Sequence, residues 1–295
     1  YSKNVGQSLA LSISPDGRWI AAGGDDNAVL VWHADSLAQR HVLRGHAEQV
    51  SAVAFSPDSR WLLSGDVYGR ARLWDLDAGA LRAKLEGHTR PIVAAAFVPN
   101  GQIALTASGD GSVAQWDLRS GRELKERMLR HPGKLQGLAI SADGRKALTG
   151  CDDGQVRVWN VETAQLERRL AGVFEKLTCV ALSPDGRLAA TVESRTDRVP
   201  VRLWDAATGQ ERERPTDAEA PDYGRAWSAT FSPDGQRLLT IGARQTRLWE
   251  LATGRMLMSY RPHSAVASAQ FSPTDARQVV TASVDRSAKL WNTGS

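Results

Sequence analysis

The amino-acid sequence predicts an all-β fold in which seven similar sheets of four antiparallel strands stand around one axis. Two repeating features carry this prediction. A tryptophan that closes a short apolar stretch recurs with gaps of 42, 42, 43, 45, 45 and 42 residues, at Trp32, Trp74, Trp116, Trp159, Trp204, Trp249 and Trp291. A turn of the type Ser-Pro-Asp-Gly recurs in step with it, beginning at Ser14, Ser56, Val98, Ser141, Ser183, Ser232 and Ser272. Periods of this length are typical of ring-shaped arrays of small sheets.

The second repeat shows the four expected strands, called a to d from the inside outwards. Residues 50–55 (VSAVAF) are apolar or small at every position, as expected for an inner strand that is covered on both faces. The turn at 56–59 leads to a second strand at 61–64, and a third strand at 71–74 ends on the tryptophan. Residues 81–85 (LRAKL) alternate between apolar and charged, which predicts a half-exposed outer strand.

The two ends of the chain predict how the ring closes. The last repeat stops shortly after Trp291, so it lacks its strand d, while the segment 1–5 precedes the first inner strand. Stacking seven sheets in a closed ring buries faces that one sheet leaves exposed, and it removes the open end of the array. We therefore predict a single domain, residues 1–295. It is a seven-bladed β-propeller with four antiparallel strands per blade, closed by pairing the N-terminal strand into the last blade.

Composition narrows the functional classes. The chain has 295 residues, 42% hydrophobic and 24% charged, and no apolar run reaches the ~18 residues that a membrane span needs. Its 37 basic and 33 acidic residues give a net charge of +4 without an arginine-rich tail, which disfavours nucleic acid as the partner. Cys151 and Cys179 are expected to be two isolated thiols rather than a disulfide or metal pair. We expect a cytoplasmic location. The chain begins with Tyr1 rather than Met, which is typical of a processed product or of a piece of a longer protein.

In these two linked repeats the chain resembles the WD-repeat β-propellers over its whole length, and its regular SPDG turns resemble those of bacterial members. This resemblance implies a rigid platform for binding partners, without a cofactor and usually without catalysis.

The resemblance also implies a bracing set in each blade, in which a Trp, a Ser or Thr, an Asp and a His are joined by hydrogen bonds. Three blades carry the full set: His88, Thr106, Asp110 and Trp116; His131, Thr149, Asp153 and Trp159; and His263, Thr281, Asp285 and Trp291. Blade 2 has His46, Ser64 and Trp74, with Tyr68 at the position of the Asp. We expect bracing to be weakest around blades 5 and 6, where Val173 and Asp222 stand at the His position.

Enzyme motifs are not found. Four of the six histidines occupy the bracing position of different blades, which is not a metal-ligand spacing. The sequence has no GxSxG, P-loop or paired-cysteine motif. The aspartates mostly fall in turns. We therefore predict a protein without catalytic residues or a metal site.

Two insertions mark a candidate binding surface. The b–c loop of blade 5, residues 193–200, contains Arg195 and Arg198, and the segment 211–223 precedes strand a of blade 6. In a propeller both loops rise on the same end of the ring, the top face. Loops on a rigid scaffold often carry binding residues. The alternative is that these are solvent-exposed loops whose sequence has drifted.

The mouth of the channel on the top face carries a predicted basic arc. Lys134, Lys176 and Arg225 occupy the start of strand a in three adjacent blades. Together with the insertions, these cations would suit a protein or acidic peptide, and the alternative is that they are ordinary solvated side chains. The predicted partner-binding residues on the top face are Lys134, Lys176, Arg225, Tyr68, Gln49, Asp25, Asp152, Arg195 and Arg198.

The functional prediction is a non-catalytic protein-interaction scaffold or recruitment module, monomeric and part of a larger bacterial signalling protein. The alternative prediction is a sensory domain that holds a fused effector, such as a kinase, nuclease or NTPase, in check.

Overall fold

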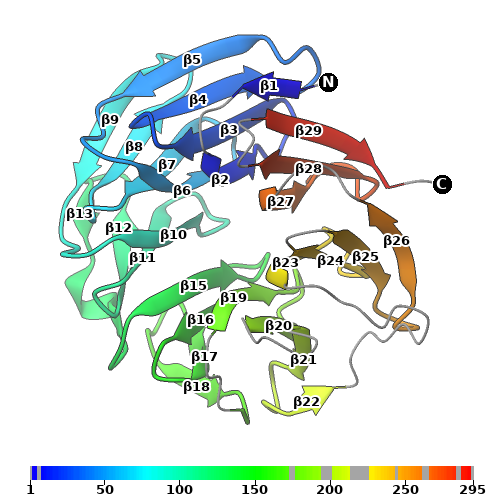
Figure 1. Ribbon diagram of the computed structural model, residues 1–295. Coiled ribbons are helices and arrows are strands. Elements are labelled where there is room, and N and C mark those ends of the chain that lie inside the picture. Colours follow the sequence, from blue (N-terminus) through cyan, green and yellow to red (C-terminus); the bar gives the residue numbers. More distant parts are fainter. Residues whose placement is uncertain are drawn as a thin grey trace.

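The computed structural model describes residues 2–4, 8–172, 177–193, 201–212, 226–242, 245–260, 266–283 and 287–293. These residues form seven sheets of antiparallel strands arranged in a ring (Figure 1). The prediction of a seven-bladed β-propeller with four antiparallel strands per blade is confirmed. Within the described residues no helix is long and apolar enough to cross a membrane.

The two inner strands of each blade are regular and six residues long, and strand b is the more deeply buried of the two. Strand a lies nearest the axis and is β2 (Ser8–Ile13), β6 (Val50–Phe55), β10 (Ile92–Phe97), β15 (Leu135–Ile140), β19 (Leu177–Leu182), β23 (Ala226–Phe231) and β27 (Val266–Phe271). Strand b is β3 (Trp19–Gly24), β7 (Trp61–Asp66), β11 (Ile103–Ser108), β16 (Lys146–Cys151), β20 (Leu188–Glu193), β24 (Arg237–Gly242) and β28 (Gln278–Ser283).

The two outer strands of each blade are more variable. Strand c carries the repeating tryptophan and is β4 (Ala28–His33), β8 (Ala71–Asp75), β12 (Ser112–Asp117), β17 (Val156–Asn160), β21 (Val201–Asp205), β25 (Thr246–Glu250) and β29 (Ser287–Asn292). Strand d is β5 (Gln39–Arg44), β9 (Ala80–Leu85), β18 (Leu166–Arg169), β22 (Glu211–Arg212) and β26 (Met256–Tyr260) in blades 1, 2, 4, 5 and 6. In blade 3 it is divided into β13 (Arg122–Glu123) and β14 (Leu129–Arg130) by the 3-10 turn η1 (Lys125–Arg127).

The ring closes through the N-terminal segment, as predicted. β1 (Ser2–Asn4) pairs antiparallel with β29, with Ser2 opposite Lys289 and Asn4 opposite Ser287. Blade 7 therefore combines strands from the beginning and the end of the sequence, and Figure 1 shows both ends of the chain at this blade. This pairing covers part of the outer edge of β29.

Removal of residues 1–6 tests the contribution of this closure. The deletion exposes the outer edge of β29, and an exposed strand edge favours pairing between molecules. We expect a lower melting temperature and concentration-dependent oligomers, measured by thermal unfolding and light scattering. Replacement of residues 1–6 by an equally long Gly-Ser segment is the matched control and should behave like the deletion. A deletion variant that stays monomeric at the wild-type melting temperature would contradict the role of β1.

The hydrophobic core lies between neighbouring blades rather than within one sheet. One cluster, for example, joins Leu63 of β7 to Phe97 of β10 and Trp116 of β12. Small residues on strand b allow this close approach, because a Cβ atom at Gly65 would lie 2.5 Å from Cγ2 of Ile92 in the next blade. Each blade is therefore stabilised mainly by its two neighbours.

The a–b turns on the bottom face are held by their own side chains. In the first blade the Ser14 hydroxyl donates to Asp16 Oδ1 at 2.6 Å and accepts the backbone N–H of Trp19 at 2.9 Å. The same serine-to-aspartate bond recurs in four further blades, at Ser56, Ser141, Ser183 and Ser232. The SPDG repeat is thus a closed hydrogen-bonded turn, which explains why its serine and aspartate recur together.

Candidate functional site

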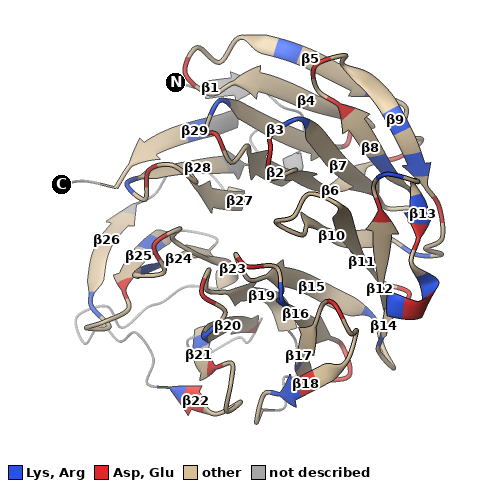
Figure 2. Cartoon of the chain, turned by 180° about the vertical axis from the view of Figure 1, so that it is seen from behind, with Lys and Arg blue, Asp and Glu red and all other residues tan. Residues whose placement is uncertain are grey.

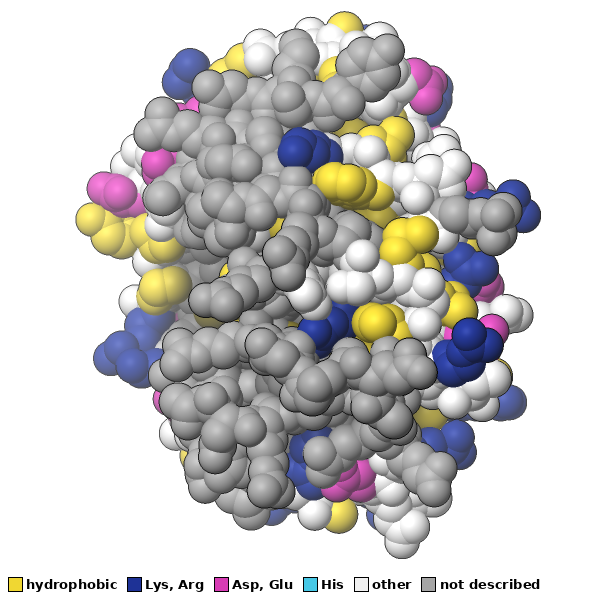
Figure 3. Space-filling model, turned by 45° about the vertical axis from the view of Figure 1, so that its right-hand side comes forward, with side chains coloured by type: hydrophobic (Ala, Val, Ile, Leu, Met, Phe, Trp, Pro, Cys, Tyr) yellow, Lys and Arg dark blue, Asp and Glu magenta, His cyan; other side chains and the backbone are white. Residues whose placement is uncertain are grey.

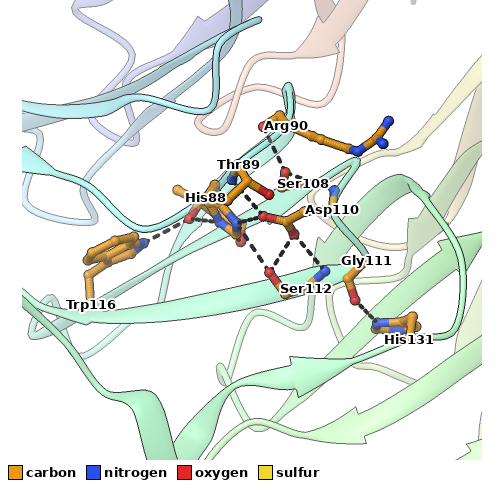
Figure 4. A network of polar contacts seen from close by, with 10 residues as sticks. His88, Thr89, Arg90, Ser108, Asp110, Gly111, Ser112, Trp116 and His131 are labelled. Carbon is orange, nitrogen blue, oxygen red and sulfur yellow. Dashed lines mark hydrogen bonds and ion pairs between the residues drawn. The ribbon is translucent and has the colours of Figure 1, made fainter.

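Blade 3 contains the complete bracing set that supports the top face (Figure 4). The indole N–H of Trp116 donates to Thr106 Oγ1 at 2.8 Å, and this hydroxyl lies 2.8 Å from Nε2 of His88. Nδ1 of His88 lies 2.9 Å from Asp110 Oδ2. Because an ionised carboxylate only accepts hydrogen bonds, Nδ1 of His88 carries a proton and donates it to Asp110. All four polar groups are thereby satisfied.

Asp110 also shapes the turn above this set. Its carboxylate accepts the backbone N–H of Thr89 at 3.0 Å and the Ser112 hydroxyl at 2.6 Å. Burial alone would raise the pKa of Asp110, but these hydrogen bonds and the neighbouring His88 outweigh it and lower the pKa below its ordinary value. Asp110 is therefore ionised at neutral pH and fixes the loop before strand a against the b–c turn.

Blade 2 corrects a prediction, because its bracing carboxylate is present and comes from Asp66. The carboxylate Oδ2 lies 2.9 Å from Nδ1 of His46, whose Nε2 lies 2.6 Å from Ser64 Oγ. The Trp74 indole donates to the same hydroxyl at 2.7 Å. Tyr68 does stand at the position of the Asp, but the carboxylate has moved two residues upstream to the end of β7, where it is fully buried.

Asp66 also forms the turn that presents Tyr68. Its Oδ1 accepts the backbone N–H of Tyr68 at 3.0 Å and that of Arg70 at 2.9 Å. One buried side chain thus links the core to the exposed b–c turn. The tyrosine ring is free to point outwards because its own side chain is not needed for bracing.

Blade 4 departs from the implied set at Asp153. The Trp159 indole donates to Thr149 Oγ1 at 2.8 Å, and this hydroxyl lies 2.8 Å from His131 Nε2. Asp153 does not reach His131; it forms an ion pair with Arg157 on β17, at 2.5 Å. Nδ1 of His131 lies 3.3 Å from the carbonyl of Gly111 instead (Figure 4). The prediction of Asp153 as a bracing partner of the histidine is wrong, because a neighbouring guanidinium competes for its carboxylate.

The exchange of partners affects the titration of His131. Burial, followed by the nearby positive charge of Arg157, lowers the pKa of His131 to about 4. Burial also lowers the pKa of His46, although the Asp66 carboxylate opposes it. Both imidazoles are therefore neutral at pH 7 and act as hydrogen-bond links.

The threonine–tryptophan link continues in the last three blades. The indole N–H groups donate to threonine hydroxyls at 2.9, 3.0 and 2.8 Å in the pairs Trp204–Thr191, Trp249–Thr240 and Trp291–Thr281. His263 and Asp285, the predicted partners in blade 7, lie outside the described residues. Blade 5 adds an ion pair between Arg202 and Glu211 across β21 and β22.

On the top face, the loop before strand a is hydrogen-bonded to the b–c turn in three successive blades. The backbone N–H groups of Val67, Gly109 and Asp152 donate to the carbonyls of Gln49, Pro91 and Lys134, at 3.1, 2.9 and 2.9 Å. In blade 4 the Asp152 carboxylate also accepts the backbone N–H of Lys134, at 2.6 Å. These bonds fix the backbone from which the Lys134 side chain extends into solvent.

Two glycines permit the close approach of these loops. A Cβ atom at Gly133 would lie 2.0 Å from the Asp152 carboxylate. Gly69 has a positive φ of 81°, and a Cβ atom there would lie 2.6 Å from the carbonyl of Arg90 in the next blade. The Tyr68 turn of blade 2 therefore abuts the Arg90 loop of blade 3.

These contacts assemble an exposed group on blades 2 to 4 that we call the top-face patch: Tyr68, Arg70, Arg90 and Lys134. Tyr68 is 58% exposed, and the Arg70 guanidinium lies 6.0 Å from the centre of its ring. Arg70, Arg90 and Lys134 are exposed, and Figure 4 shows the Arg90 guanidinium pointing away from the bracing set. The patch combines one aromatic ring with three cations.

The other predicted binding residues divide into two groups. Gln49 is half-buried beside the patch, Asp152 holds the Lys134 backbone, and Asp25 is exposed in blade 1. Lys176, Arg225, Arg195 and Arg198 lie outside the described residues, as do most residues of the two insertions.

Sequence reasoning missed Arg70 and Arg90. Arg70 follows the turn glycine, and Arg90 precedes the strand-start position occupied by Pro91. A search for cations within two residues of Tyr68 and Pro91 would have found both.

Metal-binding and thiol chemistry find little support in the part of the chain that the structure describes. No group of three histidine, cysteine or acidic side chains there has a metal-binding arrangement. Cys151 and Cys179 are free thiols, and burial raises the pKa of each above its ordinary value. Raised thiol pKa values disfavour reactive thiolates.

Comparison with known families identifies the repeats. The family of the WD domain, G-beta repeat, matches residues 4–33, 37–75, 79–117, 123–160 and 254–292, more than half of the chain. The chain belongs to the WD-repeat family. Members of this family generally act as scaffolds for other proteins, which agrees with the predicted platform.

Curated relatives are eukaryotic WD-repeat proteins. The chain is 28% identical over 120 residues to WD repeat-containing protein 90 of Mus musculus, covering 39% of this chain and 6% of that protein. It is 37% identical over 68 residues to eukaryotic translation initiation factor 3 subunit I of Phaeosphaeria nodorum, covering 23% and 20%. It is 38% identical over 71 residues to transcription initiation factor TFIID subunit 5 of Caenorhabditis elegans, covering 24% and 11%. The matched stretches thus span a fifth or less of these relatives.

Proposed function

We propose that this WD-repeat propeller is a non-catalytic interaction module that binds an acidic segment of a protein partner on its top face. The observation that carries the proposal is Tyr68, a 58% exposed aromatic ring beside Arg70, held on a turn that the buried Asp66 carboxylate fixes. Exposed aromatic and arginine side chains on a rigid base are typical of the residues that dominate binding energy at protein interfaces.

The distribution of charge supports an acidic segment rather than nucleic acid. Figure 2 shows Lys and Arg positions interspersed with Asp and Glu positions along the described strands and loops of the ring. The top-face patch, in contrast, gathers three cations on neighbouring loops. A local cluster of this size suits a short acidic stretch, whereas nucleic acid engages a longer basic surface.

The proposal extends to residues that sequence alone indicates. Lys176 and Arg225 would continue the basic arc of Lys134 into blades 5 and 6, and Arg195 and Arg198 would lie at its raised side. Residues 1–295 would form one monomeric domain of a larger cytoplasmic signalling protein. A bacterial origin remains a prediction from the SPDG turns, beside relatives that are eukaryotic.

Charge reversal tests the top-face patch. We expect the combined substitutions R70E, R90E and K134E to slow association with a fluorescent Glu-rich peptide that carries one central Phe by at least about tenfold at low salt, because these charges speed and orient the encounter. Stopped-flow rates across a salt series measure this. The matched control R82E, K84E and R122E changes net charge equally on the exposed outer strands. Equal rates for both triple variants would contradict the proposal.

A second candidate role is autoregulation, in which the propeller restrains a fused effector domain. The observation that favours it is the small share of each relative, 6% to 20%, that matches this chain. The sequence that flanks this chain in its gene tests the role. A kinase, nuclease or NTPase domain whose activity rises after the propeller is removed would support it, and unchanged activity would contradict it.

A further inference from the structure

The seam between blades 7 and 1 contains a cavity on the bottom face, the end of the ring opposite the top-face patch. Its volume is about 310 Å³. Its apolar lining consists of the buried Ile13 and Ile20 from blade 1, the buried Val280 from blade 7 and the exposed Leu290 of the same blade. We call it the seam cavity.

Leu290 is unusually exposed for its position in the blade. It stands one residue before the strand-c tryptophan and is 46% exposed. The residues at the same position in the other six blades are 0% to 5% exposed: Val31, Leu73, Gln115, Val158, Leu203 and Leu248. The seam cavity is therefore a local departure from the repeat rather than a general feature of its bottom face. On the described part of the surface drawn in Figure 3, apolar side chains form small separate groups.

Two substitutions within the repeat account for the cavity. Between blades 1 and 2, Trp19 at the start of strand b packs with Leu76, the second residue after the tryptophan, in one cluster. The equivalent pair between blades 2 and 3 is Trp61 and Leu118. In the seam between blades 7 and 1 these positions hold Gln278 and Ala34, and both line the cavity. A polar and a very small side chain leave the space that two large apolar side chains fill between blades 1 and 2 and between blades 2 and 3.

The rim of the seam cavity is acidic. Asp16, Arg18, Asp35 and Asp275 stand around it, and Arg18 is paired with Asp16 at 2.6 Å. Because Arg18 and Asp16 offset each other, the carboxylates of Asp35 and Asp275 give the rim a net negative charge. A carboxylate rim around an apolar lining attracts a group that is apolar at its tip and flanked by cations.

We propose that the seam cavity binds one bulky aliphatic side chain of a partner peptide, with Lys or Arg residues on either side of it. A volume of about 310 Å³ lies at the lower end of ligand pockets, roughly 300–1,000 Å³, and suits a single anchoring side chain. The cations of the peptide lie against Asp35 and Asp275. The site is independent of the top-face patch and gives the propeller a second surface of opposite charge preference.

Methyl-resolved NMR of the full chain tests the site. The probe is a short synthetic peptide with one Leu between lysines, titrated into protein labelled at Ile, Leu and Val methyls. We expect saturable shifts of the methyl signals of Ile13, Ile20, Val280 and Leu290. Matched peptides with Ala in place of the Leu, or with Glu in place of the lysines, should bind at least about tenfold more weakly, as expected when one leucine-sized buried contact or the charge complementarity is lost.

Substitutions in both blades that line the cavity provide a second test, so that the conclusion does not depend on a single variant. Either A34L or Q278L should fill the cavity and weaken the binding of the Leu peptide by at least about tenfold, while the protein stays folded. D35K should weaken the binding of the Leu peptide. D77K should leave this binding unchanged, because it lies at the equivalent turn of blade 2, where Leu76 fills the seam. Unshifted cavity methyls at millimolar peptide, or wild-type affinity in both filled variants, would overturn the proposal.

Discussion

Replacement of Asp66 by Ala is expected to destabilise the protein by about 3 kcal/mol. The substitution removes a fully buried carboxylate that accepts hydrogen bonds from His46 and from the backbone of Tyr68 and Arg70. It leaves a buried imidazole N–H without its acceptor, at a cost of about 1–3 kcal/mol, and the backbone N–H groups of Tyr68 and Arg70 lose the same carboxylate. Chemical denaturation followed by tryptophan fluorescence measures the difference.

Two controls separate this role from the general effect of mutating the turn. Y68A should change stability by less than about 0.5 kcal/mol, because the exposed ring is not part of the bracing set and Asp66 bonds only its backbone. D110A should cost about 1–3 kcal/mol, because that carboxylate is partly exposed and water replaces some of its bonds. If Y68A destabilised the protein more than D66A, the assignment of the carboxylate would be wrong.

Acidification from pH 6.5 to pH 4 is expected to lower the free energy of unfolding by up to about 3 kcal/mol through His131 alone. The pKa of His131 is about 4 in the folded protein and about 6.5 in an unfolded chain, so the unfolded state binds more protons between these values. The contribution of neutral His131 to the free energy of unfolding is therefore fully present above about pH 6.5 and decreases as the pH falls toward 4. His46, whose pKa is also lowered by burial, acts in the same direction.

The variant H131Q tests this assignment. A glutamine retains a donor and an acceptor but does not titrate, so the difference in stability between pH 7 and pH 4 should shrink relative to the wild type. H33Q is the control, because His33 lies at the end of β4 outside the bracing sets. The explanation fails if H131Q and the wild type show the same pH dependence from pH 7 to 4.

The fold could be predicted from sequence because its signals are redundant. Seven copies of two linked motifs fix the number of blades, and the position of Trp291 at the end of the chain predicts the pairing of β1 with β29. The division of strand d in blade 3 by η1 could not be predicted, because residues 122–130 lack a turn signal. There the extra chain length is absorbed at the outer edge, where few contacts constrain the backbone.

The bracing sets show why single positions are harder to predict than the fold. A motif assigns the carboxylate to the position of Tyr68, but the physical requirement is only that some carboxylate reach His46, and Asp66 meets it from two residues away. In blade 4 the expected Asp153 is present, yet Arg157 takes its carboxylate. Competition between neighbours of this kind depends on three-dimensional distances that a linear pattern does not contain.

The top-face patch and the seam cavity illustrate a related limit. Arg70 and Arg90 join Tyr68 only because the blade 2 turn abuts the blade 3 loop at Gly69. The seam cavity becomes visible only when Ala34 and Gln278, distant in sequence, are seen at the same place. The sequence predicts the face on which the top-face patch lies, but its repeats give no sign of the seam cavity.

The most direct test of the central claim is a residue-resolved NMR footprint of the Glu-rich peptide on the full chain. The account predicts that backbone amide signals of residues 66–70, 88–91 and 133–134 shift in a saturable manner, and that the shifts diminish as salt is added. Signals of the outer strands and of the seam cavity should stay in place. A saturable footprint confined to the bottom face or the outer strands would contradict the assignment of the top-face patch as the binding surface.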